Sequence, residues 1–353
     1  MYLFIGPTTG TKTGQAISLI NLLKNFNEQH LVLNTNFEGK NLFFKLCMLF
    51  NLFLKTYQIK QQPKTIYVSI KRSFFGLISD YILLRKFLFQ NSKIVLHFHG
   101  MDVNYENGNF FYRKIFLKIW NKSDLIIVPS SQLNKKFKSL KEKKIEVVNN
   151  YSEKIISSIE LNQKVNLFYK KPLRVLYLSN LIYSKGIIDT IKAINLINNT
   201  SIEIELHIAG EVMGDEFLSK KKLQKEINKN LNKNTFFKGF ISGDEKWQLL
   251  INSDILILPT FYKSEFQPAV IIEAIAHGCL IVCTDHGAIV DSFGKDNLLI
   301  VEKNNPNSIK STLMSIINDP NQYKETILNS YDKIKINFNM TKINNTIYKL
   351  LKE

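Results

Sequence analysis

Cysteine is scarce in this chain of 353 residues. The three cysteines, Cys47, Cys279 and Cys283, form no even, spaced framework and no paired CxxC motif with distant histidine or cysteine ligands. This pattern excludes a small disulfide-stapled domain and provides no zinc site. We therefore expect reduced thiols, no metal and no bound cofactor.

Long apolar runs are also missing. The most apolar stretch, Asn41 to Leu54, contains Lys45 and falls short of the roughly 20 residues that a bilayer-spanning helix needs. The start, MYLFIGPTTG, has no basic region and only a short apolar run, which is typical of a first strand and not of a signal peptide. We expect a cytoplasmic protein whose 41–54 segment can lie on a membrane without crossing it.

Acidic residues are scarce in one half only. Residues 1–171 carry 26 Lys/Arg against 10 Asp/Glu, whereas residues 172–353 carry 21 against 20. A lysine-rich genome would load both halves equally, so the asymmetry favours an anionic partner: nucleic acid, an anionic membrane surface, or a phosphorylated lipid or glycan. Three basic, apolar stretches, at 40–60, 85–89 and 113–120, would suit a membrane surface if helical, although each alone also fits an ordinary core-facing helix.

The length and the hydrophobic pattern predict two α/β domains. A chain this long fits two domains of about 150–200 residues. Apolar runs alternate with amphipathic stretches, as in parallel βα units. The expected strands are 2–5, 31–34, 65–68, 93–98, 125–129 and 145–148, then 174–178, 203–209, 235–237, 255–258, 280–284 and 298–301. A polar segment, 152–171, ends at Pro172 and places the linker near 165–173.

The clearest motif follows the strand that ends at Leu258-Pro259. It is the run Ser264 to Gly278, which reads SEFQPAVIIEAIAHG and predicts a loop that feeds a helix, with Pro268 in the first turn and Gly278 at the stop. The start of such a helix favours an anion such as a diphosphate. Glu265 and Glu273 could then accept hydrogen bonds from sugar and ribose hydroxyls, although each alone also fits an ordinary solvated residue.

Here the sequence resembles a known family. Glu265-x7-Glu273, followed by His277-Gly278, is similar to the E-x7-E motif of retaining GT-B glycosyltransferases, most closely glycosyltransferase family 4, the glycosyl transferases group 1. The resemblance is strong over 173–303, where further matching segments keep the family's order and spacing: LRVLYLSNLIYSKG at 173–186, LHIAG at 206–210, FFKGF at 236–240 and LPT at 258–260.

The resemblance implies a GT-B architecture of two Rossmann-like domains facing each other across a cleft. Residues 1–170 would form the acceptor-binding domain, and 171–334 would form the nucleotide-sugar donor domain. The final helix, 335–353, would pack back onto the first domain.

Carried over by position, the family pattern gives roles to the residues of the second half. Lys185 would bind the donor diphosphate, Glu265 the hydroxyls of the transferred sugar and Glu273 the ribose. The loop Phe266, Gln267, Pro268 and Ala269 would supply backbone N–H groups, and Phe240 and Ile241 would flank the nucleobase. The family's usual arginine beside the lysine is Asn180 here, which removes a positive charge from the phosphate site.

The first half offers fewer site residues. His99 lies at the end of the 93–98 strand, where the family places a histidine near the reacting sugar carbon, although a lone histidine is more often structural. The turn from Gly6 to Gln15 is not a Walker A motif, because Thr11 separates Gly10 from Lys12. It matches instead the family's glycine-containing loop that faces the acceptor and diphosphate, which makes Gly10 and Gly14 candidate residues.

The resemblance therefore implies metal-independent, retaining transfer of a hexosyl or N-acetylhexosaminyl unit from a nucleoside diphosphate sugar. A UDP-sugar is the first expectation for the donor. A polyprenyl-diphosphate-linked glycan, as in bacterial surface polysaccharide, lipopolysaccharide or O-antigen synthesis, is expected as the acceptor, with the basic half at the cytoplasmic face of an anionic inner membrane. The alternatives are a GT-B nucleotide-sugar epimerase, a non-catalytic binding module and a nucleic-acid-binding protein, but no nucleic-acid-binding module is seen.

Overall fold

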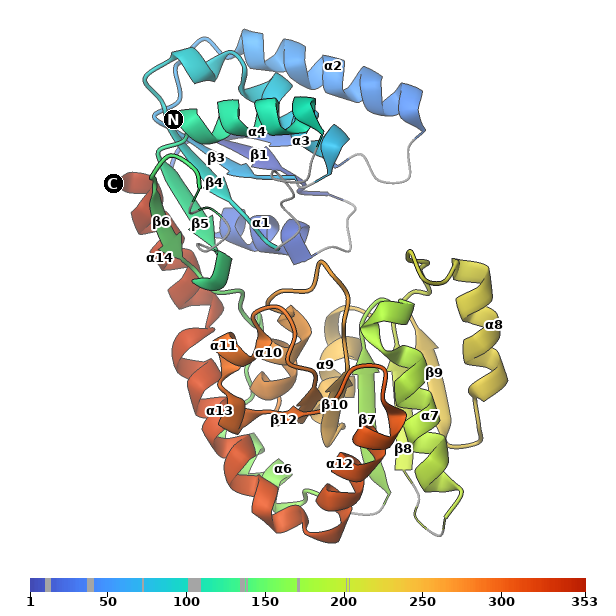
Figure 1. Ribbon diagram of the computed structural model, residues 1–353. Coiled ribbons are helices and arrows are strands. Elements are labelled where there is room, and N and C mark those ends of the chain that lie inside the picture. Colours follow the sequence, from blue (N-terminus) through green and yellow to red (C-terminus); the bar gives the residue numbers. More distant parts are fainter. Residues whose placement is uncertain are drawn as a thin grey trace. The chain divides into compact units, whose positions relative to one another are not determined.

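The structure, a computed structural model, describes residues 1–9, 14–36, 41–71, 73–100, 109–133, 137, 139–169, 172–200, 202 and 204–353. The chain divides into two compact units. Unit 1 contains Met1–Asn149 and Ile343–Glu353, and unit 2 contains Asn150–Lys342. Each unit is built around one parallel sheet with helices on its faces (Figure 1). The alternating βα pattern predicted this architecture correctly.

Unit 1 has a six-stranded parallel sheet in the order β2-β1-β3-β4-β5-β6. Figure 1 shows α2, α3 and α4 on one face and α1 on the other. The strands are β1 Tyr2–Gly6, β2 His30–Asn34, β3 Thr65–Ser69, β4 Lys93–His97, β5 Leu125–Val128 and β6 Lys144–Val147. The helices are α1 Gly14–Lys24, α2 Leu42–Gln58, α3 Phe74–Leu84, η1 Phe87–Phe89 and α4 Phe110–Lys122.

Unit 2 repeats the plan with the order β12-β11-β10-β7-β8-β9. Its strands are β7 Leu173–Leu178, β8 Ile204–Ala209, β9 Thr235–Gly239, β10 Ile255–Leu258, β11 Leu280–Cys283 and β12 Leu299–Ile300. Its helices are α6 Ser158–Asn166, η2 Tyr183–Lys185, α7 Ile187–Asn198, α8 Lys220–Asn230, α9 Gly243–Ile251, α10 Ala269–Ala276, α11 Ile289–Phe293, η3 Lys295–Asn297, α12 Pro306–Asn318, η4 Pro320–Tyr323 and α13 Lys324–Asn337.

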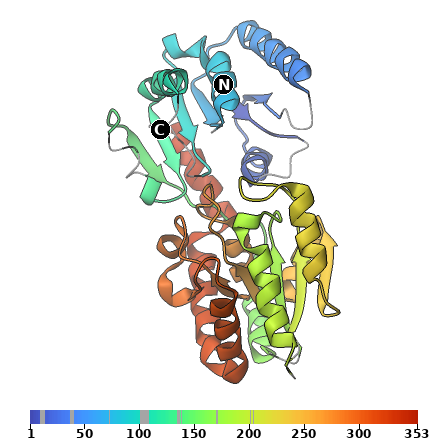
Figure 2. The ribbon, with the colours of Figure 1, turned by 45° about the vertical axis from the view of Figure 1, so that its right-hand side comes forward.

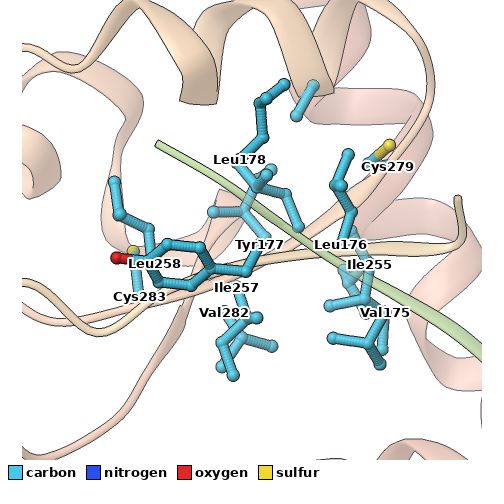
Figure 3. Packing of buried hydrophobic residues seen from close by; sticks show 14 of the residues in the cluster. Val175, Leu176, Tyr177, Leu178, Ile255, Ile257, Leu258, Cys279, Val282 and Cys283 are labelled. Atoms are coloured by element: carbon cyan, nitrogen blue, oxygen red, sulfur yellow. The ribbon is translucent and has the colours of Figure 1, made fainter. Parts of the chain in front are cut away.

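The core of unit 2 lies at its central strands. β10 and β11 are buried along their whole length and read ILIL and LIVC, as expected for parallel strands covered on both faces. Val175 and Tyr177 from β7 pack with Ile257 from β10 and Val282 from β11 (Figure 3). This rigid centre fixes the loops that follow β7 and β10.

The boundary between the units falls between Asn149 and Asn150, ahead of the 165–173 linker expected from the polar composition. The polar segment instead contains helix α6, which begins with a capping box between Ser157 and Glu160. Lys164 of this helix donates to the His277 carbonyl at 2.6 Å, so α6 belongs with unit 2.

The C-terminal region forms two helices. α13 ends at Asn337, and α14 runs from Met340 to Lys352. The last residues belong to unit 1, where the Tyr348 hydroxyl donates to the Leu22 carbonyl at 2.6 Å and Thr65 Oγ1 donates to the Leu351 carbonyl at 3.0 Å. Throughout the described ranges, no helix has both the length and the apolar character needed to cross a membrane.

Candidate functional site

The loops after β7 and β10 meet at the switch point of the unit 2 sheet. The chain moves from β7 toward β8 and β9 on one side, while β10 leads to β11 and β12 on the other. In open α/β sheets ligands bind outside the strand ends at such a point. The Phe261 N–H donates to the Ser184 carbonyl at 2.7 Å and joins the two loops. Lys185 and Glu265 come from these two loops.

Lys185 and Glu265 form an ion pair, with 3.0 Å between Lys185 Nζ and Glu265 Oε2. Their side chains are only 15% and 12% exposed. Lys185 Nζ also donates to Ser179 Oγ at 2.9 Å and lies 5.6 Å from the centre of the Tyr262 ring. The buried Glu265 Oε2 accepts no hydrogen bond within the described part of the chain, so its contact with Lys185 is electrostatic and leaves acceptor capacity for a ligand hydroxyl.

Backbone contacts hold Glu265 in place. Its N–H donates to the Tyr262 carbonyl at 2.8 Å, and the same carbonyl lies 2.8 Å from His286 Nε2. Gly287, at φ +61°, lies so close that an added Cβ would be 2.5 Å from the Glu265 carbonyl oxygen. On the other side, burial and the charge of Glu265 raise the pKa of Tyr177 well above its ordinary value. These contacts hold the backbone of Glu265, and its carboxylate lies against Lys185.

Glu273 lies on α10 and pairs with a lysine that the sequence patterns did not reveal. Lys246 of α9 places its Nζ 2.7 Å from Glu273 Oε1, and the two side chains are 16% and 14% exposed. Lys246 Nζ also lies 3.9 Å from the centre of the Trp247 ring. Burial raises the pKa of Glu273, and Lys246 opposes that shift. Both carboxylates of the E-x7-E spacing are thus neutralised by lysines.

The N-cap residue of α10, Pro268, provides no side-chain capping hydrogen bond to the start of the helix. Pro268 is the residue before the helix, one position earlier than the first-turn place expected for it, and Ala269 opens the helix. Phe266 is buried. Gln267 accepts from the Asn150 N–H at 2.6 Å through Oε1, and its Nε2 donates to Ser292 Oγ at 3.0 Å. Asn150 Nδ2 also donates to the Gln267 carbonyl at 2.8 Å, so the side chain and the carbonyl of Gln267 both hold structure.

Three further predicted residues follow β7 and β9. Asn180 is exposed beyond the end of β7. Phe240 follows β9 and is 42% exposed, whereas the Ile241 side chain is buried in the core of unit 2. The Phe240 ring can offer an aromatic surface to a base, while Ile241 can contribute only its backbone. No cluster of His, Cys, Asp and Glu suited to a metal ion occurs among the described residues.

Comparison with known proteins identifies the family. Residues 158–333 match the sequence profile described as glycosyl transferases group 1. The chain belongs to this family. It is 22% identical over 258 residues to TuaC of Bacillus subtilis, a glycosyltransferase assigned to teichuronic acid biosynthesis, and the alignment covers 70% of this chain but only 61% of TuaC.

For two further proteins, the match extends over a larger share of the other protein than it does for TuaC. An uncharacterized glycosyltransferase of Methanocaldococcus jannaschii is 25% identical over 311 residues, or 84% of this chain and 75% of that protein. The crystal structure of Anabaena HepE in complex with UDP-glucose has a TM-score of 0.76 at 16% identity and covers 100% of this chain and 99% of that chain. This likeness confirms the expected GT-B fold.

In the N-terminal part of this glycosyltransferase-family chain, His99 follows β4 and is half-buried. Its ring centre lies 4.0 Å from that of His97, which is hydrogen-bonded to the Tyr67 hydroxyl. Burial, with a smaller effect from His99, holds the pKa of His97 well below its ordinary value. His99 therefore lies at the strand end where the sequence placed it, beside a histidine that stays neutral.

The glycine-containing loop after β1 is described only in part. Gly10 lies outside the described residues. Gly14 is the exposed first residue of α1, and an added Cβ there would meet nothing within 4 Å. The next residue, Gln15, donates through Nε2 to Ser69 Oγ at 2.9 Å and so ties the start of α1 to the end of β3.

Sequence reasoning missed Lys246 and Gly287. Lys246 stands in an ordinary amphipathic stretch, and its pairing with Glu273 depends on α9 lying beside α10, which no local pattern predicts. Gly287 carried no motif, although its positive φ and close approach to Glu265 make glycine the residue that fits.

Proposed function

We propose that the chain is a metal-independent, retaining glycosyltransferase. It transfers a hexosyl or N-acetylhexosaminyl unit from a nucleoside diphosphate sugar to a hydroxyl of a glycan acceptor. A UDP-sugar is the donor that the comparisons favour, because HepE, which shares the fold, was crystallised with UDP-glucose. Unit 2 binds this donor, and unit 1 binds the acceptor.

The observation that carries the proposal is the Lys185–Glu265 pair at the switch point. A buried cation suits a diphosphate, and a carboxylate with spare acceptor capacity suits sugar hydroxyls. A nucleotide sugar presents both groups. On binding, the diphosphate would take over Lys185, and the sugar hydroxyls would take over Glu265.

The remaining residues extend this assignment. Glu273 accepts from the ribose hydroxyls after Lys246 gives way, and the start of α10 donates backbone N–H groups to the diphosphate. Phe240 and the Ile241 backbone flank the base, with Asn180 at the edge of the phosphate site. Negative charge grows on the leaving diphosphate during transfer, and Lys185 with the α10 start stabilises it without rearranging. The leaving phosphate then accepts the proton of the attacking hydroxyl.

The acceptor is a polyprenyl-diphosphate-linked glycan of a bacterial surface polysaccharide. The strong positive charge of residues 1–171 favours an anionic lipid-linked acceptor, and TuaC, which this chain resembles, is named for teichuronic acid biosynthesis. His99 would contact the transferred sugar, and the loop of Gly10 and Gly14 would face the acceptor. The enzyme would then work at the cytoplasmic face of the inner membrane.

Nuclear magnetic resonance of UDP-sugars incubated with the protein tests the reaction class. We expect slow hydrolysis in the absence of acceptor that releases the sugar first as the anomer present in the donor, and loss of this signal in Lys185→Met. Release of the opposite anomer would contradict retention. Formation of the C2 epimer of the sugar would show that the protein is an epimerase and not a transferase.

A further inference from the structure

Helix α2 of unit 1 turns an apolar surface away from the protein. Its one buried residue is Thr56, and Met48, Leu49, Leu52 and Phe53 are partly buried at the spacing of a single helix face. The opposite face carries large apolar side chains with high exposure: Phe43 71%, Phe50 62%, Tyr57 53% and Leu54 44%. A surface helix ordinarily presents polar residues there. Figures 1 and 2 show α2 at the margin of unit 1, beside α3.

The part of the sequence that contains α2 and α3 is strongly positive. Residues 41–100 contain nine Lys/Arg and a single acidic residue, Asp80. Asp80 is fully buried and pairs with Lys71 at 2.6 Å, so it adds no negative charge to the surface. Helix α4, on the same face of the sheet, has no acidic residue. On α2 itself Lys45 and Lys55 are exposed, and Lys86 donates to the carbonyls of Thr56 and Ile59 at the helix end.

We propose that α2 lies in the plane of an anionic bilayer and inserts Phe43, Phe50 and Leu54 among the acyl chains. Apolar insertion and lysine attraction to anionic headgroups are the two contributions that hold interfacial helices. The inference rests on the proposed lipid-linked acceptor and names the element that brings the enzyme to it. With 17 residues interrupted by Lys45, Asn51 and Lys55, α2 is suited to lying on a bilayer.

The charge and composition of this surface also argue against a second copy of the chain or nucleic acid as its partner. A second copy docked through α2 would bring Lys45 and Lys55 of both chains together, with no described acidic side chain exposed on α2, α3 or α4 to offset them. Nucleic acid would match the lysines but not the row of Phe and Leu between them. A bilayer with anionic headgroups matches both.

Flotation of the full chain with vesicles tests the proposal. The wild type is expected to bind vesicles of phosphatidylcholine with phosphatidylglycerol more strongly than vesicles of phosphatidylcholine alone. Joint substitution Phe43→Ser and Phe50→Ser should weaken binding by roughly tenfold or more. The matched control is Ile159→Ser with Ile336→Ser in unit 2, which removes side chains that are 72% and 60% exposed and should leave binding unchanged.

Two further measurements distinguish apolar insertion of α2 from the electrostatic attraction of its lysines. Cys47 lies on α2 and is exposed, whereas Cys279 and Cys283 are buried, so a polarity-sensitive dye will label α2 without any substitution. We expect its emission to shift to shorter wavelength on anionic vesicles and to be quenched by brominated lipids. Lys45→Glu with Lys55→Glu should weaken binding to anionic vesicles and leave the weak binding to phosphatidylcholine unchanged.

The proposal is overturned if the phenylalanine variant floats like the wild type, if the Cys47 dye stays in an aqueous environment, or if the phenylalanines instead support a dimer without vesicles. UDP binding, measured on the same samples, keeps the two proposals apart. Normal UDP binding with no vesicle binding contradicts only the proposal that α2 binds the bilayer. Normal vesicle binding with no UDP binding contradicts the donor site alone.

Discussion

At the scale of single residues, the candidate site is a pair of carboxylates that are each matched with a lysine. Glu265 with Lys185 and Glu273 with Lys246 have similar distances, 3.0 and 2.7 Å, and all four side chains are between 12% and 16% exposed. Charges this buried cost free energy unless they are paired. At the Lys185–Glu265 pair, a ligand that offers an anion to the lysine and hydroxyls to the carboxylate can replace the ion pair and leave both groups hydrogen-bonded.

Glu265→Gln is expected to separate binding from chemistry. The amide keeps the shape of the side chain but releases Lys185 from its ion pair, so UDP alone should bind more tightly, by about 1 kcal/mol. Transfer from the UDP-sugar should slow by roughly tenfold or more, because the sugar loses a charged acceptor. Calorimetry with UDP and a turnover assay measure the two effects.

The control for this change is Glu216→Gln, which alters the same charge in an exposed pair with Lys263. It should change neither quantity. Weaker UDP binding in Glu265→Gln would contradict the competition between Glu265 and the diphosphate for Lys185.

Lys246→Met is expected to make stability depend more strongly on pH than it does in the wild type. Burial already raises the pKa of Glu273 above 4.5, and loss of Lys246 raises it further. Between pH 4.5 and that raised pKa the folded state binds more protons than the unfolded state, so stability falls as pH rises through this window. The variant should lose about 1–3 kcal/mol near neutral pH and less in acid.

Denaturant unfolding across this pH range measures the loss. Lys263→Met removes a lysine at a similar distance from its partner, 2.6 Å, but in a pair whose side chains are 68% and 52% exposed, and it should cost under about 1 kcal/mol at every pH. A loss in Lys246→Met that does not vary with pH would show that Glu273 is not the group responsible.

At the scale of elements, the site depends on how closely the loop after β7 approaches the loop after β10. Gly186, at φ +79°, ends the short helix η2 that carries Lys185. A Cβ at this position would lie 2.5 Å from the Pro259 carbonyl oxygen. The glycine therefore meets two demands: a left-handed backbone and space for the neighbouring loop.

Two separate variants, Gly186→Ala and Gly243→Ala, distinguish the backbone demand from the space demand. Gly243 has a similar φ of +60°, but an added Cβ there meets nothing within 4 Å. Gly243→Ala should therefore cost only the backbone strain, about 1 kcal/mol, and leave UDP binding intact. Gly186→Ala should cost more and weaken UDP binding by moving Lys185, as measured by unfolding and calorimetry. Equal effects of the two changes would contradict the close-approach role.

Local sequence predicted the elements better than the contacts between them. Buried strands such as β10 and β11 are visible as short apolar runs, and the parallel topology then places the residues after them at one sheet edge. Helix α6 was missed because only Leu161 and Val165 along it are buried. The polar composition of the rest of the helix is typical of a linker. The Lys246–Glu273 pair was missed because it joins residues of two different helices.

At the scale of the whole molecule, the two units have similar topology and different charge. Unit 1 contains 24 Lys/Arg against 9 Asp/Glu, whereas unit 2 contains 23 against 21. The E-x7-E motif, Lys185 and the glycines that position them all belong to unit 2. This division agrees with the proposal that unit 2 binds the nucleotide-sugar donor and that the positively charged unit 1 binds an anionic partner.

The most direct measurement is thermal unfolding of the wild type and Glu273→Ala with UDP-, GDP- and ADP-sugars. With UDP-sugar at about a hundredfold over Kd, the unfolding temperature of the wild type should rise by roughly 4 °C. GDP- and ADP-sugars should have smaller effects, and Glu273→Ala should lose most of the UDP-sugar shift. No stabilisation by any nucleotide sugar, or an equal shift in Glu273→Ala, would contradict a donor site built on Lys185, Glu265 and Glu273.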